Sequence, residues 1–117
     1  MIEFIGIPFD KKDCFQLTRE VYKHMHNYDM LQTDIRHNES EKVYKAFMDE
    51  STKWQKVEPQ KGVIVAMSFD PKYPKIVTHF GVMIDNHRMI HTTEKTGSMI
   101  ENISKYKGLI KGFYRHF

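Results

Sequence analysis

The sequence predicts an α+β domain, with N-terminal helices packed on a central antiparallel β-sheet. Two observations support this prediction. Apolar residues in the first half of the chain recur at helical spacing, whereas those in the second half form short β-rich runs between turn residues. Helices that precede the strands, instead of alternating with them, are typical of α+β proteins. The 117 residues suit one modest core, so a single domain over residues 1–117 is expected.

The first helix is predicted to begin near Asp13. The Asp13 carboxylate can accept a hydrogen bond from an amide of the first turn, so this residue is the predicted N-cap. Residues 1–10, which contain Gly6 and Pro8, are expected to form an extended arm and a turn. Spacings of three and four define the buried face of the helix, which comprises Cys14, Leu17, Val21 and Met25.

A second helix is predicted from Glu39 to about Lys53, with Val43 and Phe47 on its apolar side. Trp54 is expected to pack where this helix ends. Five strands are then predicted, with a turn over Glu58–Gly62 before them and a hairpin turn at Asp85–His87. The predicted strands are Val63–Phe69, Ile76–Ile84, Arg88–Thr93, Met99–Ile103 and Ile110–Arg115.

Net charge, cysteine content and the distribution of apolar residues limit the classes of function that this chain can have. The net charge of +3, from 18 basic and 15 acidic residues spread singly along the chain, does not predict nucleic-acid binding. The single cysteine excludes an internal disulfide and a metal site built on several thiolates. The start of the chain lacks the features of a secretory signal, and no run of about 18 apolar residues is present to span a membrane. Synthesis in a cytoplasm without a signal peptide is therefore expected.

Cys14 is the candidate nucleophile. It falls in the first turn of the predicted helix, where unpaired amides and the helix dipole favour an anion and lower the pKa of a thiol. The apolar stripe that continues from Cys14 directs the thiol toward the rest of the fold, from which a general base would have to come. The alternative is a structural role, because a lone cysteine most often behaves as a small buried hydrophobe.

Two of the seven histidines, His79 and His91, lie inside predicted strands. His79 shares one strand face with Gly81, and the opposite face, which carries Phe80, is the apolar one expected to pack on the core. A three-residue loop at Asp85–His87 places Gly81 opposite His91 and both histidines on one face, within side-chain reach. A two-residue loop would separate them. The other five histidines are expected at the surface: His24, His26, His37, His87 and His116.

Two other interpretations of the histidine pair stay open. The rings of His79 and His91 could be half-exposed sheet residues without a catalytic role. A two-histidine metal site is weaker, because no Asp, Glu or Cys falls nearby at a convincing ligand spacing. No cofactor is therefore expected.

Several segments, in order, resemble the NlpC-type cysteine peptidases of bacteria and their phages. The segment around the cysteine is similar to the family's Asp-Cys-Ser/Trp-Gly-Leu-Val motif, and the two histidine strands, with eleven residues between the histidines, match the family spacing. The resemblance covers nearly the whole chain. It is carried by Ile5–Phe9, Asp13–Leu17, Pro59–Val65, Thr78–Ile84, Met89–His91 and the phage-like tail Gly112–Arg115.

The resemblance implies a papain-like NlpC-type fold and a triad of Cys14, His79 and His91 that needs no metal. It also implies hydrolysis of amide bonds in peptidoglycan stem peptides, of the D,L-endopeptidase or amidase type. A phage tail or virion component, with other tail proteins as partners, is the implied setting. His79 would act as the base, and His91 would orient its ring.

Two alternatives to a hydrolase remain. Gln16 stands where the family has a glycine, and Phe9 lacks the hydroxyl that a tyrosine near this position supplies in many members. These departures favour a catalytically retired peptidase fold with a structural or interaction role. A papain-like acyltransferase, which passes the acyl group to an acceptor other than water, is the second alternative.

Overall fold

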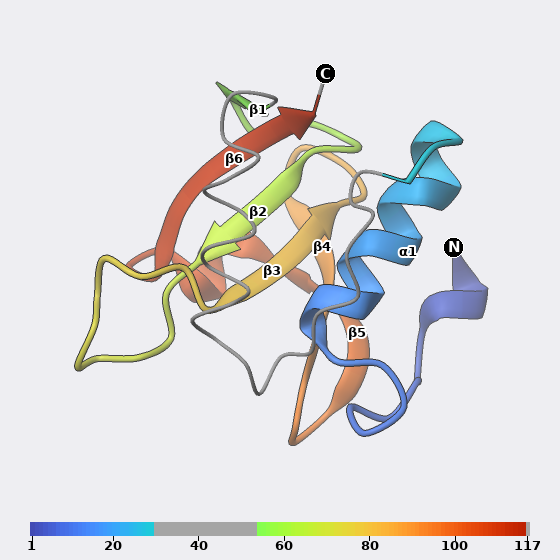
Figure 1. Cartoon of the computed structure of the whole chain (residues 1–117), viewed down its shortest axis with the longest axis horizontal. Coiled ribbons are helices and arrows are strands. Elements are labelled where there is room, and N and C mark those ends of the chain that lie inside the picture. The colour runs from blue at the N-terminus through green and yellow to red at the C-terminus, as the bar shows by residue number, and fades with distance from the viewer. Residues whose placement is uncertain (30–53, 117) are drawn as a thin grey trace.

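A computed structural model describes residues 1–29 and 54–116 of the chain. In these residues one α-helix, α1 (Cys14–His26), lies against a six-stranded antiparallel sheet of strand order β1-β6-β2-β3-β4-β5 (Figure 1). The α+β class is therefore confirmed, while the predicted second helix falls outside the described residues. The strands are β1 (Trp54–Val57), β2 (Ile64–Met67), β3 (His79–Met83), β4 (Arg88–Thr93), β5 (Gly97–Asn102) and β6 (Ile110–His116).

Helix α1 begins where the sequence predicts. The Asp13 carboxylate accepts a hydrogen bond from the Gln16 backbone amide at 3.0 Å, and the Gln16 side chain accepts one from the Asp13 amide at 3.2 Å. This reciprocal pair is a capping box, which satisfies two amides that a helix start leaves unpaired. Gln16, a departure from the resembled family, thus has a structural role. The helix ends at Asn27, whose left-handed φ of 63° closes the last turn.

Both faces of the central strands are buried, by different partners. On one face, β3 packs against α1. Phe80 belongs to a buried cluster with Phe15 and Tyr22 of the helix, and Val82 belongs to a cluster with Leu17. The opposite face is covered by a short 3-10 helix, η3 (Ile103–Tyr106), and by neighbouring side chains. The apolar residues buried on this second face are Val63, Val65, Met67, Met83 and Met89. The prediction that Phe80 faces the core is confirmed.

The N-terminal segment differs from the prediction. Instead of an extended arm, Ile2–Phe4 form a 3-10 helix, η1, which is followed by turns. Ser98 of β5 holds this segment, because its hydroxyl accepts a hydrogen bond from the Ile7 amide and donates one to the Phe4 carbonyl. Long-range bonds of this kind are set by the tertiary fold, so local sequence does not reveal them.

One strand was missed at the sequence level. Trp54, expected to pack at a helix end, opens β1 and pairs with His116 of β6. An edge strand of four residues carries too little alternation to be recognised before its pairing partner is known. The other predicted strands are present with altered ends, and β4 matches its prediction at both ends. In the described parts of the chain, no helix has the length and apolar character needed to cross a bilayer.

Candidate active site

The β3–β4 hairpin brings the two candidate histidines together. The Ile84 amide donates to the Arg88 carbonyl at 2.9 Å, and Val82 pairs with Ile90, as a three-residue loop requires. His79 and His91 consequently share one face, with Nε2 of His79 and Nδ1 of His91 2.8 Å apart. The side chains are 3% and 0% exposed, which rules out the interpretation of half-exposed sheet residues.

Gly81 makes room for this pair. A Cβ atom at position 81 would lie 3.0 Å from the Ile90 carbonyl oxygen, 3.0 Å from the Met89 sulfur and 3.2 Å from the His91 Cβ. Such distances are tighter than ordinary van der Waals contact, so a side chain here would displace β4 or the His91 ring. The glycine opposite His91 is therefore a steric requirement of the histidine pair.

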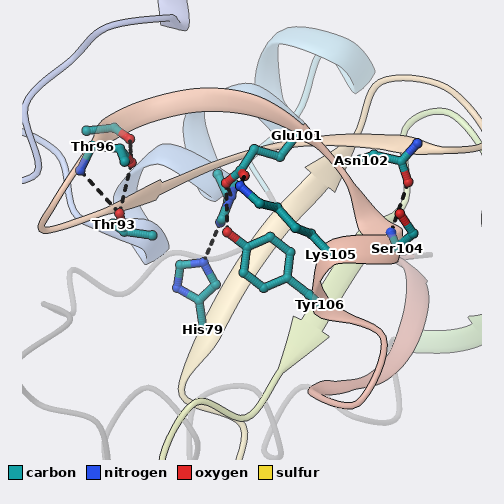
Figure 2. A network of polar contacts seen from close by, with 10 residues as sticks. His79, Thr93, Thr96, Glu101, Asn102, Ser104, Lys105 and Tyr106 are labelled. Atoms are coloured by element: carbon teal, nitrogen blue, oxygen red, sulfur yellow. Dashed lines mark hydrogen bonds and ion pairs between the residues drawn. The ribbon is translucent and has the colours of Figure 1, made fainter.

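The hydrogen bonds continue from His91 to an acidic residue that the sequence analysis did not single out. Nε2 of His91 lies 2.8 Å from Oε1 of Glu101, on β5. The same carboxylate accepts hydrogen bonds from the Tyr106 hydroxyl at 2.7 Å and from Lys105 Nζ at 2.6 Å, and Figure 2 shows these three side chains converging. The Glu101 side chain is 7% exposed. Asn102 caps η3, which carries both donors, by accepting from the Ser104 amide.

Aromatic rings hold the imidazole planes. The Phe69 ring stacks on His79 with centroids 4.2 Å apart and an interplanar angle of 18°. Tyr106 lies edge-on to His91 at 5.1 Å. A ring held both by stacking and by a hydrogen bond loses rotamer freedom, which is the requirement for an orienting group in a catalytic site.

Cys14 lies at the start of α1, on the element that packs against β3. The backbone N–H of Phe80 approaches the sulfur, and this amide nitrogen is bonded to the carbonyl carbon of His79. Burial raises the pKa of the Cys14 thiol to about 12, the Asp13 charge adds to the rise, and backbone amides offset only part of it. The expectation that the helix start lowers this pKa is therefore wrong, because the sulfur is 0% exposed and desolvation disfavours a thiolate.

The structure thus brings His79 and His91 into direct contact and places Cys14 beside the backbone of β3. Helix α1 covers the Phe80 face of the sheet, whereas the imidazole pair belongs to the opposite face with Met83 and Met89. The start of α1 therefore does not lie on the His79 face of the sheet. Cys14 contacts the backbone at the start of β3, where the side chains of consecutive residues point to the two faces of the sheet.

A pocket of about 350 Å³ opens beside His79. Two carboxylates, of Asp70 and Glu94, belong to its lining, and Thr92 contributes a buried hydroxyl for which the described part of the chain offers no hydrogen-bond partner. Phe9 reaches the pocket from the N-terminal segment that Ser98 holds. Of the two imidazoles, His79 is the one that lines the pocket. The remaining lining residues are Phe69, Thr78 and Thr93.

No metal centre is found in residues 1–29 and 54–116, where no three or more His, Cys, Asp and Glu side chains gather as ligands. Both ring nitrogens of His91 are engaged by His79 and Glu101 at 2.8 Å. These contacts suit proton exchange between side chains better than metal ligation.

Comparison with known proteins adds no family assignment: no protein-family model matches the chain, and no curated protein matches it.

Glu101 was missed although the sequence held a signal for it. The turn at 94–96 pairs His91 with Met99 and Met89 with Glu101, which places Glu101 on the His91 face, diagonal to the ring. The register of the Asp85–His87 hairpin, continued through the turn at 94–96, predicts this neighbour from the sequence. Tyr106 lies in η3, where no strand periodicity indicates the direction of its side chain.

Proposed function

We propose that this chain is a cysteine-dependent peptidase or amidase of the papain-like NlpC type, which hydrolyses amide bonds of peptidoglycan stem peptides. Cys14 is its nucleophile, His79 the base and His91 the orienting residue. The observation that carries the proposal is the buried hydrogen bond between His79 and His91, beside an open pocket and next to the strand residue that contacts Cys14. The peptidoglycan substrate and the phage-tail setting rest on the resemblance to the family.

The reaction runs in two halves. The Cys14 sulfur forms a bond to the amide carbonyl carbon while its proton passes to His79. The carbon–nitrogen bond then breaks, and His79 returns that proton to the leaving amine. Water, deprotonated by His79, attacks the acyl carbon, the carbon–sulfur bond breaks, and His79 returns the proton to the sulfur to restore the thiol. His91 holds the His79 ring through both halves.

The raised pKa of Cys14 decides the timing of the first proton transfer. A thiol with a pKa of about 12 is protonated at neutral pH, so a resting thiolate–imidazolium pair is not expected. The proton must leave during attack, with His79 as general base, as in serine peptidases.

Cys14→Ala tests the proposal. We expect it to abolish the release of soluble fragments and new amino groups from purified peptidoglycan, because no other cysteine is present to replace the nucleophile. His87→Ala, in the exposed hairpin turn, is the matched control and should keep the wild-type rate. Thermal unfolding of each variant shows that the fold is intact. Hydrolysis by Cys14→Ala at the wild-type rate would contradict the proposal.

A retired peptidase fold is the second candidate, and the burial of Cys14 favours it. The single cysteine allows a clean comparison of iodoacetamide alkylation at neutral pH in wild type and His79→Ala. Faster alkylation in wild type supports a base that acts on the sulfur. Equal, slow alkylation of both proteins favours a structural or interaction subunit. An acyltransferase would be recognised by transfer of the acyl group to an added amine in preference to water.

A further inference from the structure

Three groups form a directed series of hydrogen bonds in the interior of the protein. The series runs from the His79 ring to His91, with 2.8 Å between Nε2 and Nδ1, and from His91 to Glu101, with 2.8 Å between Nε2 and Oε1. Both rings are buried, and the carboxylate is nearly so. Every ring nitrogen in the series except Nδ1 of His79 is therefore assigned to a bond within it.

The chemistry of the last member sets the direction of the hydrogens. An ionised carboxylate can only accept, so the hydrogen in the His91–Glu101 bond belongs to Nε2 of His91. A neutral imidazole has one N–H group, which leaves Nδ1 of His91 as an acceptor. The hydrogen between the two rings then belongs to Nε2 of His79. Neutral His79 consequently carries its lone pair on Nδ1.

The surroundings keep Glu101 ionised and His91 neutral at neutral pH. Burial acts to raise the pKa of Glu101, but hydrogen bonds from Lys105, Tyr106 and His91 outweigh it and lower the pKa to about 2. Burial lowers the pKa of His91 more than the hydrogen bond and charge of Glu101 raise it. Among residues 1–29 and 54–116, the titratable groups that face His91 are His79 from β3, Glu101 from β5, and Tyr106 and Lys105 from η3.

We propose that Glu101 is a positioning residue, which orders the hydrogens of His91 and His79 so that Nδ1 of His79 is the atom that takes a proton. The inference rests on the proposed function for its use in hydrolysis, but the hydrogen order itself does not. Without the carboxylate, His91 can hold its hydrogen on Nδ1 and donate it to His79. The His79 hydrogen then moves to Nδ1, and the base is lost.

The test is the tautomer of each ring, measured by nitrogen NMR on protein with ¹⁵N-labelled histidine at pH 7.5. His79→Gln and His91→Gln assign the signals. In wild type we expect a hydrogen on Nε2 of both rings and an unprotonated Nδ1 in both. In Glu101→Gln, whose amide can either donate or accept, we expect a mixture of tautomers in both rings. Opposite tautomers in wild type, or unchanged tautomers in Glu101→Gln, would overturn the inference.

Lys105→Gln is the matched control. It removes a donor to the same carboxylate from a side chain that is 70% exposed, and it leaves the bond between Glu101 and His91 in place. The ring tautomers should therefore stay as in wild type. A shift as large as that of Glu101→Gln would assign the effect to general disturbance of the carboxylate and would overturn the specific role. The wild-type spectrum alone can overturn the inference, so it remains testable even if a variant folds poorly.

Activity provides the second readout. In metalloenzymes, removal of the carboxylate that orients a ligand histidine lowers activity by about 10- to 100-fold. Glu101 orients His91 in a comparable way, so we expect kcat of Glu101→Gln to fall by this factor with little change in KM. Wild-type kcat in a variant with mixed tautomers would overturn the role in hydrolysis. Absence of hydrolysis by the wild-type protein would refute the proposed function instead, and the NMR result would still decide the hydrogen order.

Discussion

Two groups of histidines occupy opposite regions of the sheet, and they are bonded in different ways. Near β1 and β6, Nε2 of His26 lies 2.7 Å from the Gly62 carbonyl oxygen, and Nδ1 of His116 lies 3.0 Å from the Tyr28 hydroxyl. In the β3–β4–β5 region, the series from His79 through His91 ends on a carboxylate. The first group ties loops and termini to neutral partners, whereas the second ends on a fixed charge.

The comparison shows why histidine number and burial alone do not identify a catalytic base. His26 also packs on an aromatic ring, with its centroid 4.0 Å from that of Tyr22, much as His79 stacks on Phe69. A neutral carbonyl oxygen that accepts from one imidazole sets the position of the hydrogen on that ring only. An ionised carboxylate bonded to a second imidazole orders the hydrogens of two rings. The end of the series therefore distinguishes the candidate site from a structural cluster.

The largest expected effect separates the two regions by activity. His79→Ala should lower peptidoglycan hydrolysis by about 10²- to 10⁴-fold, the usual contribution of a general base. His26→Ala should keep the wild-type rate and lower the free energy of unfolding by about 1 kcal/mol, because it removes one hydrogen bond. Rates measured on purified peptidoglycan, with urea unfolding of both variants, check the prediction. Equal loss of activity in both variants would contradict the assignment of a catalytic role to His79 and a structural role to His26.

The next effect concerns the space around the His79–His91 pair. Gly81→Ala should lower the free energy of unfolding by about 1–3 kcal/mol, because its Cβ would press on β4 and on His91. Hydrolysis should fall as well, since the His91 ring is displaced. Gly108→Ala is the control: a Cβ there meets nothing within 4 Å, and near wild-type stability is expected. The urea midpoints of the two variants measure this difference in stability. A stable, fully active Gly81→Ala would contradict the steric role of Gly81.

The smallest effect is a dependence of stability on pH. Folding lowers the pKa of His91 from its ordinary value of 6.5, so the unfolded chain binds the proton more readily and stability falls as pH drops below about 6.5. Glu101, lowered from 4.5 to about 2, adds a second loss between these values. Urea midpoints at pH 7.5, 5.5, 4.5 and 2.5 measure both losses of stability. His91→Asn should flatten the first step, and an unchanged slope would show that another group causes it.

Much of the fold followed from local pattern. The spacing of Cys14, Leu17 and Val21 predicted α1 and its buried face, and Asp13 is its N-cap. The alternation in β3, with the three-residue loop that follows, predicted the contact between His79 and His91. These features depend on residues close in sequence, where helix and hairpin geometry leave few alternatives.

The sequence by itself determined the α+β class, the capped start of α1 and the histidine pair, because each follows from the period of a helix or the register of one hairpin. The tertiary structure alone decided the rest. The packing of α1 on the Phe80 face buries Cys14 and raises its pKa, against the effect of the helix start. Likewise, the folding of η3 against β5 gives Glu101 its donors and its charge. Desolvation and long-range hydrogen bonds depend on what surrounds a residue in space, which no local pattern specifies.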